Sequence, residues 1–246
     1  MRNLSAYAQI GSALILAGAI AAPVFFFVAD SVALTALALS SVMLGFIALL
    51  LARSLPKVSP RAAQILLDAG LENLAGLVEE LGVEARAIYL PSHLTGGKPR
   101  ALIPLHSNPA TAEITRALPQ RMIVDFGPNP EDVGILVVTP GGAVMRLLDA
   151  PPGSSSSEIE ATLARVLVGA LDLATSVLVA QEPGGITVNI AGIRFETDDL
   201  WIYRVLGSPI ASVAAAIVAE GLGRPVTIQA EERAADRLVV RIEVMS

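Results

Sequence analysis

Two long apolar runs fill the first 52 residues, Ala8 to Val28 and Val32 to Ala52, and little more than Asp30 separates them. At about 1.5 Å per residue, each run forms a helix of roughly 31 Å, close to the hydrocarbon thickness of a bilayer. The pattern therefore predicts a transmembrane helical hairpin within residues 1–54. A cleaved signal peptide is the alternative, because Ala19-Ile20-Ala21 has the small residues of a cleavage site. The apolar run continues past this point and a second one follows at once, which favours a retained hairpin.

Charged residues flank the hairpin and indicate its orientation. Arg2 precedes the first span and Arg53, Lys57 and Arg61 follow the second, whereas the connection carries Asp30. By the positive-inside rule, we expect both termini and the soluble domain in the cytoplasm, anchored to the cell membrane, with the lipid bilayer as a partner. Neither span contains Lys, Arg, Glu or His, so the sequence does not favour an ion or proton pathway.

Small residues recur inside both spans. They are Gly11 and Gly18 in the first span, and Ser40, Ser41 and Gly45 in the second. Small side chains let neighbouring helices approach closely. The packing of the two spans on each other is favoured over a dedicated seam for self-association.

A linker at 55–60 leads into a soluble domain at 61–246, and this domain repeats one plan near its two ends. The first copy is a helix that ends near Leu81, followed by a hairpin of Glu84–Leu90 and Arg100–Leu105. Counting equal numbers of residues outward from a turn centred near residue 96 places Tyr89 roughly opposite Ile103.

The second copy begins with Gly207-Ser208-Pro209, where Ser208 is expected to cap a helix that Pro209 opens. A glycine ends this alanine-rich helix, and Pro225–Ala230 and Arg237–Val244 then form a hairpin. The common plan suggests two related helix-hairpin units. Strands joined by short turns predict an α+β domain, with a mainly antiparallel sheet and helices packed on it.

Between the two copies, Asn108–Leu118 is expected to form a short helix, and Arg121–Phe126 and Gly134–Thr139 are expected to form strands. Pro140-Gly141-Gly142 should then turn the chain into another strand at Ala143–Leu148. Glycine-rich turns can hold phosphate, but the spacing here is not that of a phosphate loop or a dinucleotide fingerprint. A plain turn is favoured.

The segment Asp149–Ser156 is rich in Pro, Gly and Ser and is expected to be an internal linker, with a possible subdivision of the domain there. Ser157 and Glu160 match a capping box for a helix that ends near Gln181. The second half of this helix, Val166–Ala180, is apolar nearly all round. Such a helix is either buried in the domain or packed on a partner.

A strand at Gly185–Glu196 and a short helical turn with Trp201 and Tyr203 complete this part of the chain. Trp201 and Tyr203 are two of its few large aromatic residues. Together with Val166 and Val177 of the apolar helix, they are the candidate surface for a protein partner or for self-association.

Charge and cysteine content exclude several kinds of function. The chain has 17 basic and 23 acidic residues, and no basic stripe follows the hairpin, so no nucleic-acid partner is expected. The absence of cysteine excludes disulfides, thiolate metal sites and thiol nucleophiles. His93 and His106 are expected at different heights of the first hairpin, which disfavours a two-histidine metal site. We therefore expect no cofactor, no metal and no catalytic constellation.

A candidate anion or ligand site lies at the helix start formed by Gly207 and Ser208. Free amides and the helix dipole favour a negative group there, and Arg204 and Arg224 could supply positive charge if the fold brings them close. A capping role explains Ser208 without any ligand, so the site is an alternative and not the preferred interpretation.

Three motifs, in order, are Tyr89-Leu90-Pro91, Pro140-Gly141-Gly142 and Gly207-Ser208-Pro209-Ile210-Ala211-Ser212. After an N-terminal pair of spans, this order resembles a family of uncharacterised archaeal two-span membrane proteins. Sequences of that family tend to have cysteines where this chain has Ser208 and Ala211, which argues against a thiol or metal function here. The family has no assigned activity, so the resemblance implies an architecture and no mechanism.

These observations favour a membrane-anchored, non-catalytic cytoplasmic module that binds a protein partner or a small ligand. A structural or assembly subunit of a membrane complex is the first alternative. A membrane-proximal enzyme acting on an anionic substrate, through the helix start at Ser208, is the second.

Overall fold

The computed structural model describes residues 6–54, 70, 72–106, 114, 116–194 and 200–245. The chain forms two compact units, one within residues 1–67 and the other within residues 68–246. The first unit contains a helical hairpin, and the second is an α+β domain.

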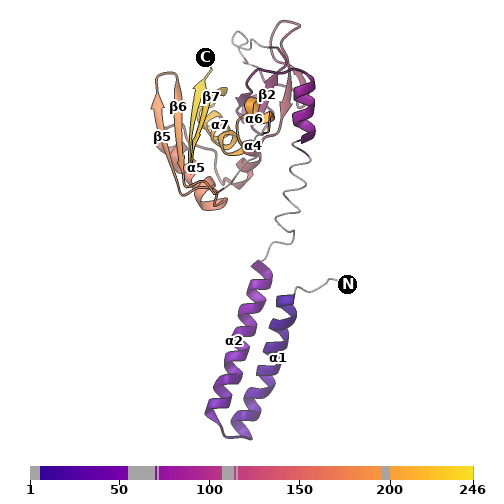
Figure 1. Cartoon of the computed structure of the whole chain (residues 1–246), viewed down its shortest axis with the longest axis vertical. Helices are drawn as coiled ribbons and strands as arrows, with labels where there is room; N and C mark the ends of the chain where they lie inside the picture. Colours follow the sequence, from indigo (N-terminus) through magenta and orange to yellow (C-terminus); the bar gives the residue numbers. More distant parts are fainter. Residues whose placement is uncertain are drawn as a thin grey trace. The chain divides into compact units, whose positions relative to one another are not determined.

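Helices α1 (Ala6–Phe27) and α2 (Val32–Ser54) form the hairpin (Figure 1). Both are long and apolar enough to cross a membrane, as the sequence predicts. Their large apolar side chains point outward and stay exposed, for example Phe27 at 79% and Met43 at 70%.

A seam of small residues joins α1 to α2. A Cβ added to Gly11 would lie 2.8 Å from the carbonyl oxygen of Gly45, and one added to Gly18 would lie 2.6 Å from that of Ala38. The two residues on each helix are one heptad apart, which is the repeat of a left-handed coiled coil. These glycines therefore pack the two spans against each other, as the favoured interpretation predicts.

The α+β domain contains an eight-stranded antiparallel sheet in the order β3-β4-β2-β1-β7-β8-β6-β5. This arrangement confirms the predicted fold class. The strands are β1 (Ile88–Leu90), β2 (Arg100–Pro104), β3 (Ile123–Asp125), β4 (Val133–Val137), β5 (Ser176–Glu182), β6 (Gly185–Ala191), β7 (Val226–Ala234) and β8 (Arg237–Val244).

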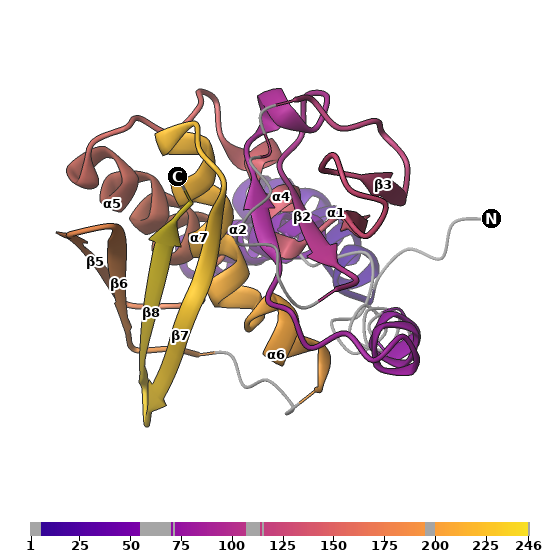
Figure 2. The ribbon, with the colours of Figure 1, turned by 90° about the horizontal axis from the view of Figure 1, so that it is seen from above.

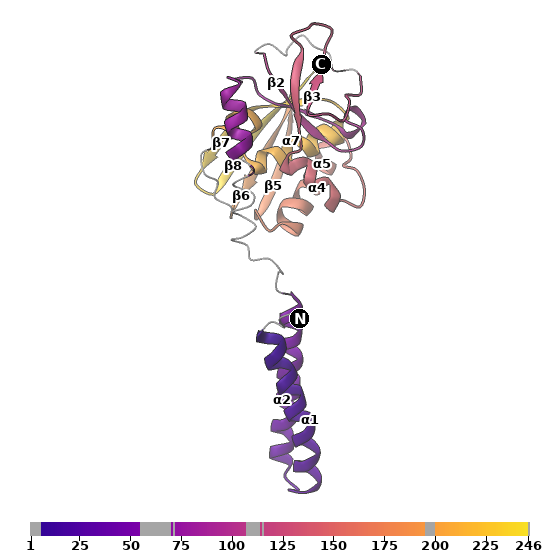
Figure 3. The same cartoon turned by 90° about the vertical axis from the view of Figure 1, so that its right-hand side faces the viewer.

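Helical segments connect these strands and cover one face of the sheet (Figures 1 and 3). Residues 72–80 are helical, which confirms the later part of the first predicted helix. The other helical elements are η1 (Ser92–Leu94), α4 (Pro140–Val144), η3 (Met145–Leu147), α5 (Ser156–Ala164), the π-helix η4 (Arg165–Ala170), α6 (Ile202–Leu206) and α7 (Pro209–Leu222).

Helix α7 lies at the centre of the main core, and every residue from Ile210 to Ala219 is buried. It contacts β1, β7 and β8 on one side, and it also packs on α4 and α5. Figure 2 shows it behind β7 and β8. The alanines explain this position, because a small side chain lets a helix be enclosed by close neighbours.

The two halves of the sheet differ on the face away from α7. On the β1-β2-β3-β4 half, a second apolar cluster covers this face, with Leu90 and Leu102 packed under Leu118 and Phe126. On the other half, polar side chains such as Asn189, Gln229 and Arg241 are exposed on this face.

Both predicted hairpins are present. Strands β7 and β8 pair over their whole length, with a register shift between Ile228 and Ala230. Strands β1 and β2 also pair, but Tyr89 lies opposite Ala101, two residues from the predicted partner. The difference arises because a 3₁₀ turn at η1 takes up part of the connection.

The prediction for Pro140–Leu148 is wrong, since this segment is helical in α4 and η3 and not a turn followed by a strand. The side chain of Thr139 accepts a hydrogen bond from the Gly142 amide and caps α4. A Cβ added to Gly141 would lie 2.3 Å from the Ser212 carbonyl oxygen of α7. The glycine pair therefore allows two helices to touch.

The prediction of a long apolar helix at Val166–Ala180 is also wrong. Helix α5 is capped by Ser155 with Glu158, two residues before the predicted capping box, and it continues as the π-helix η4. The chain then reverses near Asp172, whose φ is +51°, and forms strand β5. The two-residue turn Pro183-Gly184 joins β5 to β6.

Other predictions are settled in part. Strand β6 ends at Ala191 and not at Glu196. Of the predicted helix at Asn108–Leu118, residues 114 and 116–118 are described and none of them is helical, so the prediction is wrong there. The other residues of this segment, and the start of the first domain helix, lie outside the described residues. One core cluster contains residues from both sides of 149–156, the segment where a subdivision is predicted.

Candidate functional site

The predicted helix start is present at the N-terminus of α7. The Ser208 hydroxyl accepts a hydrogen bond from the Ala211 amide at 3.3 Å, and Pro209 occupies the first helical position. Gly207 has a φ of +71°, and a Cβ there would lie 2.6 Å from Ile228. Glycine is therefore needed at this position to join α6 to α7 beneath β7.

A carboxylate of the chain itself lies at this N-terminus. The Ser208 amide donates a hydrogen bond to Oε2 of Glu231 at 2.9 Å. Glu231 follows the register shift in β7. A negative group at a helix N-terminus interacts favourably with the helix dipole. The place that a bound anion would take is thus held by Glu231, a residue that the sequence analysis did not single out.

The two arginines of the candidate anion site lie at opposite ends of α7. Arg204 is an exposed residue of α6, shortly before the N-terminus of α7. Arg224 follows the C-terminus of α7 and donates a hydrogen bond to the Met245 carbonyl oxygen at 2.9 Å. A helix of this length spans about 21 Å. The structure therefore brings Gly207 and Ser208 together but does not bring Arg224 to them.

A buried tyrosine lies next to the same helix start. The hydroxyl of Tyr89 in β1 donates a hydrogen bond to the Leu206 carbonyl oxygen at 2.5 Å, and the side chain is 1% exposed. Burial raises the pKa of this hydroxyl; a hydrogen bond with Ser212 lowers it, and the charge of Glu231 raises it further. Tyr89 is consequently neutral at physiological pH and serves as a hydrogen-bond donor. It fixes the α6–α7 junction to the sheet.

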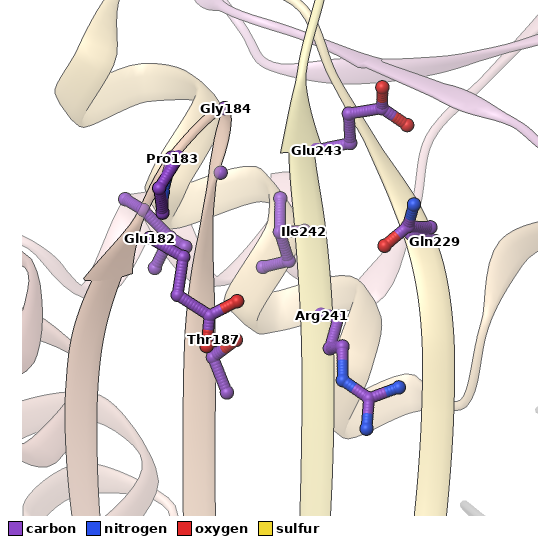
Figure 4. Close-up of a pocket in the computed structure, with 10 residues that line it drawn as sticks. Glu182, Pro183, Gly184, Thr187, Gln229, Arg241, Ile242 and Glu243 are labelled. Atoms are coloured by element: carbon purple, nitrogen blue, oxygen red, sulfur yellow. Dashed lines mark hydrogen bonds between the residues drawn. The ribbon is translucent and has the colours of Figure 1, made fainter.

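A polar hollow of about 130 Å³ lies on the sheet where β5 turns into β6, and β7 and β8 form its far side (Figure 4). Its lining includes Glu182, Thr187, Gln229, Arg241 and Glu243. Gly184 and Gly185 of the turn also line it, and a Cβ added to Gly184 would meet no atom within 4 Å.

Hydrogen bonds already engage part of this lining. The Thr187 hydroxyl donates to Oε1 of Glu182 at 2.8 Å, and Arg241 forms an ion pair with Glu232 at 2.8 Å. Charges of both signs thus line the hollow. Chemically, it offers hydrogen-bond donors and acceptors to a small polar ligand.

The histidines lie apart from these features. His93 is an exposed residue of η1, and His106 is exposed just after β2. Within the described ranges, no three side chains of His, Cys, Asp and Glu gather closely enough to hold a metal ion.

The candidate partner surface must be corrected. Val166 and Val177 are 1% and 6% exposed, so both belong to the core and not to a surface. Trp201 and Tyr203 are partly exposed on and beside α6, where they pack against the same core. The apolar pattern predicts both valines on one helix, whereas Val166 lies in η4 and Val177 in β5.

No curated protein and no solved structure matches the chain. Residues 2–244 match a domain of unknown function, DUF7982. The match extends over the helical hairpin and over the α+β domain, so both are parts of one conserved unit of sequence. The chain therefore belongs to the DUF7982 family.

Proposed function

We propose that this protein is a membrane-anchored module whose α+β domain binds a protein partner or a small ligand without catalysing a reaction. The hairpin carries the anchoring part of the proposal. Large apolar side chains around α1 and α2 are exposed, and burying apolar surface away from water is favourable by about 25 cal/mol per Å². Lipid supplies that burial, and water does not.

The cytoplasmic orientation also belongs to the proposal. Basic residues precede the first span and follow the second, whereas the connection between the spans carries Asp30. These basic residues are Arg2, Arg53, Lys57 and Arg61. The motif order supports a place among archaeal two-span membrane proteins. An assembly subunit of a membrane complex is the alternative that shares this anchor.

The binding part of the proposal rests on the uncovered face of the β5–β8 half of the sheet. Polar side chains are exposed there, and the hollow beside Thr187 offers donors and acceptors of both charges. Among the residues that the structure describes, the pKa is shifted for Tyr89, which holds the α6–α7 junction, and for Glu158, which caps α5. Each shift thus has a structural explanation, which favours binding over catalysis.

Anchoring and orientation can be tested with single cysteines, because the natural chain has none. We expect S31C, in the hairpin connection, to react with a membrane-impermeant maleimide in intact cells, and D236C to react only after lysis. The protein should stay with membranes after carbonate extraction. A soluble chain would refute the anchor, and the reverse labelling pattern would refute the cytoplasmic placement.

Ligand binding can be tested with an environment-sensitive dye on Q229C in the full chain, reconstituted in phospholipid vesicles. A dye on E131C, in the β3–β4 connection, is the matched control. We expect the Q229C dye to respond to the dialysable fraction of a cell extract or to its protein fraction, and the control to respond to neither. Equal responses of the two dyes, or no response, would contradict the proposal.

A further inference from the structure

Strand β5 is the outermost strand on its side of the sheet, and its only strand neighbour among the described residues is β6. Its sequence, Ser-Val-Leu-Val-Ala-Gln-Glu, contains no proline and no basic residue. Leu178 is 63% exposed. An edge strand of this length whose only charged residue, Glu182, lies at its end is a template for pairing with another chain.

The two edges of the sheet differ in length. The opposite edge strand, β3, has three residues, whereas β5 has seven. A short strand offers few hydrogen bonds to an incoming chain, so its edge is protected by its length. The edge at β5 has no such protection and needs another.

A carboxylate covers the middle of the β5 edge. The amide of Val179, the central residue of the strand, donates a hydrogen bond to Oε2 of Glu160 at 2.7 Å. Glu160 belongs to α5, which packs against β5. The side chain therefore takes the backbone donor that an added strand would use, and it places a negative charge beside the edge.

We propose that Glu160 prevents strand β5 from pairing with β5 of a second copy of this chain. The sequence of β5 favours such a pair: a two-fold arrangement centred on Val179 would place Leu178 of one copy opposite Ala180 of the other. Glu182 of each copy would lie opposite Ser176, so no like charges would face each other. The same arrangement would bring the two Glu160 carboxylates together at its centre. Their repulsion and the occupied Val179 amides both oppose pairing.

The test uses two full-length chains in one phospholipid vesicle, one with L178C and one with A180C, each with a different tag. Both positions are exposed, and the natural chain has no cysteine. With Glu160 present, we expect little disulfide between the two tags under mild oxidation. With E160A in both chains, the yield should rise at least about tenfold, which corresponds to about 1.4 kcal/mol.

Matched controls isolate the effect of Glu160. E79A removes an exposed carboxylate from the helix at 72–80 and should leave the yield unchanged. Replacing A180C by I123C, on the opposite edge, should give only collisional cross-linking in every background. E160Q removes the charge but keeps an acceptor oxygen, so its disulfide yield should lie between the yield with Glu160 and the yield with E160A.

Equal cross-linking with Glu160 and with either substitution would overturn the proposal. Because Trp201 packs on the core of the same domain, its fluorescence reports whether E160A is folded. If E160A unfolds, the test is the disulfide yield of E160Q compared with that of the chain with Glu160. An unchanged yield in E160Q then refutes the role of the charge.

Discussion

Replacing Tyr89 by phenylalanine tests the physical account of the α6–α7 junction. The substitution removes the hydroxyl that donates to the Leu206 carbonyl oxygen and keeps the ring. A buried group that loses its partner costs about 1–3 kcal/mol. We therefore expect Y89F to lower the free energy of unfolding by about this amount at neutral pH.

The same substitution should have a defined pH dependence. Unfolded tyrosine ionises near pH 10, whereas burial raises the pKa of Tyr89 in the folded state. Above pH 10 the unfolded state has lost a proton that the folded state retains, so the Tyr89 contribution to stability falls as pH rises. The difference between the natural chain and Y89F should shrink by about 1.4 kcal/mol per pH unit above that point.

The full chain in detergent micelles can be unfolded with urea while the fluorescence of Trp201, the single tryptophan, is recorded. The control is T187V, which also removes a buried hydroxyl that donates a hydrogen bond but does not titrate. Its difference from the natural chain should stay constant between pH 8 and about pH 11. If the Y89F difference is equally constant over that range, the reasoning about the buried hydroxyl is refuted.

Three further substitutions test other contacts. G141A should lower the free energy of unfolding by about 1–3 kcal/mol, because its Cβ would lie 2.3 Å from a backbone oxygen of α7, whereas G169A, which meets no atom within 4 Å, should have little effect in the same urea titration. G18L should separate the two spans, because a Cβ there already lies 2.6 Å from the Ala38 carbonyl oxygen; distances between spin labels on α1 and α2 should increase, and unchanged distances would contradict the seam. Hydrogen bonds from the capping residue's hydroxyl and amide lower the pKa of Glu158, so an NMR titration should show a midpoint below the ordinary glutamate value. The contribution of this cap to the free energy of unfolding is then present above the ordinary glutamate pKa and lost as pH falls through the lowered pKa. E158Q should abolish this pH dependence. A midpoint at the ordinary glutamate value would rule out the capping box of Ser155 and Glu158.

Local signals predicted several elements correctly. The hairpin was evident from the length of its apolar runs, and α7 from the serine cap and following proline. Strands β7 and β8 were predicted as a hairpin, although β7 continues to Ala234, four residues beyond its predicted end at Ala230. In each case the signal lies within the element itself, and no distant contact is needed to recognise it.

Distant contacts explain the parts that sequence reasoning missed. Val166–Ala180 is apolar apart from Asp172, Thr175 and Ser176, and such a run does not distinguish a buried helix from a buried strand. The Glu231 carboxylate reaches the Ser208 amide from 23 residues away, through the register shift in β7. The cover that Glu160 gives to Val179 likewise exists only once α5 lies against β5. No local pattern encodes these pairings.

The strand order gives the α+β domain an internal symmetry that bears on the predicted duplication. Strands β1 and β7 pair at the centre, with Tyr89 opposite Val226, and each is followed outward by its own hairpin partner, β2 or β8. A further hairpin lies beyond each of these, β3–β4 on one side and β5–β6 on the other. The two halves are not equivalent in their cover, since the second apolar cluster lies on the first half alone. The half formed by β5, β6, β7 and β8 therefore has a face that no apolar cluster of the described residues covers. The proposed binding function uses this face, whereas a purely structural role would not.

By length and hydropathy alone, Ile202–Leu222 would also be a candidate membrane span. Its burial within the domain shows why burial must be considered together with length. This window is 67% buried within the domain, whereas those of the two N-terminal spans are 11% buried. Gly207 interrupts it with a positive φ, and the longer piece, α7, reaches about 21 Å, short of the roughly 30 Å of a bilayer core. Apolar surface on α7 is covered by β1, β7, β8, α4 and α5, so it needs no lipid. In the hairpin, the seam covers only the faces that meet, and the remaining large apolar side chains stay exposed, which is consistent with a membrane anchor.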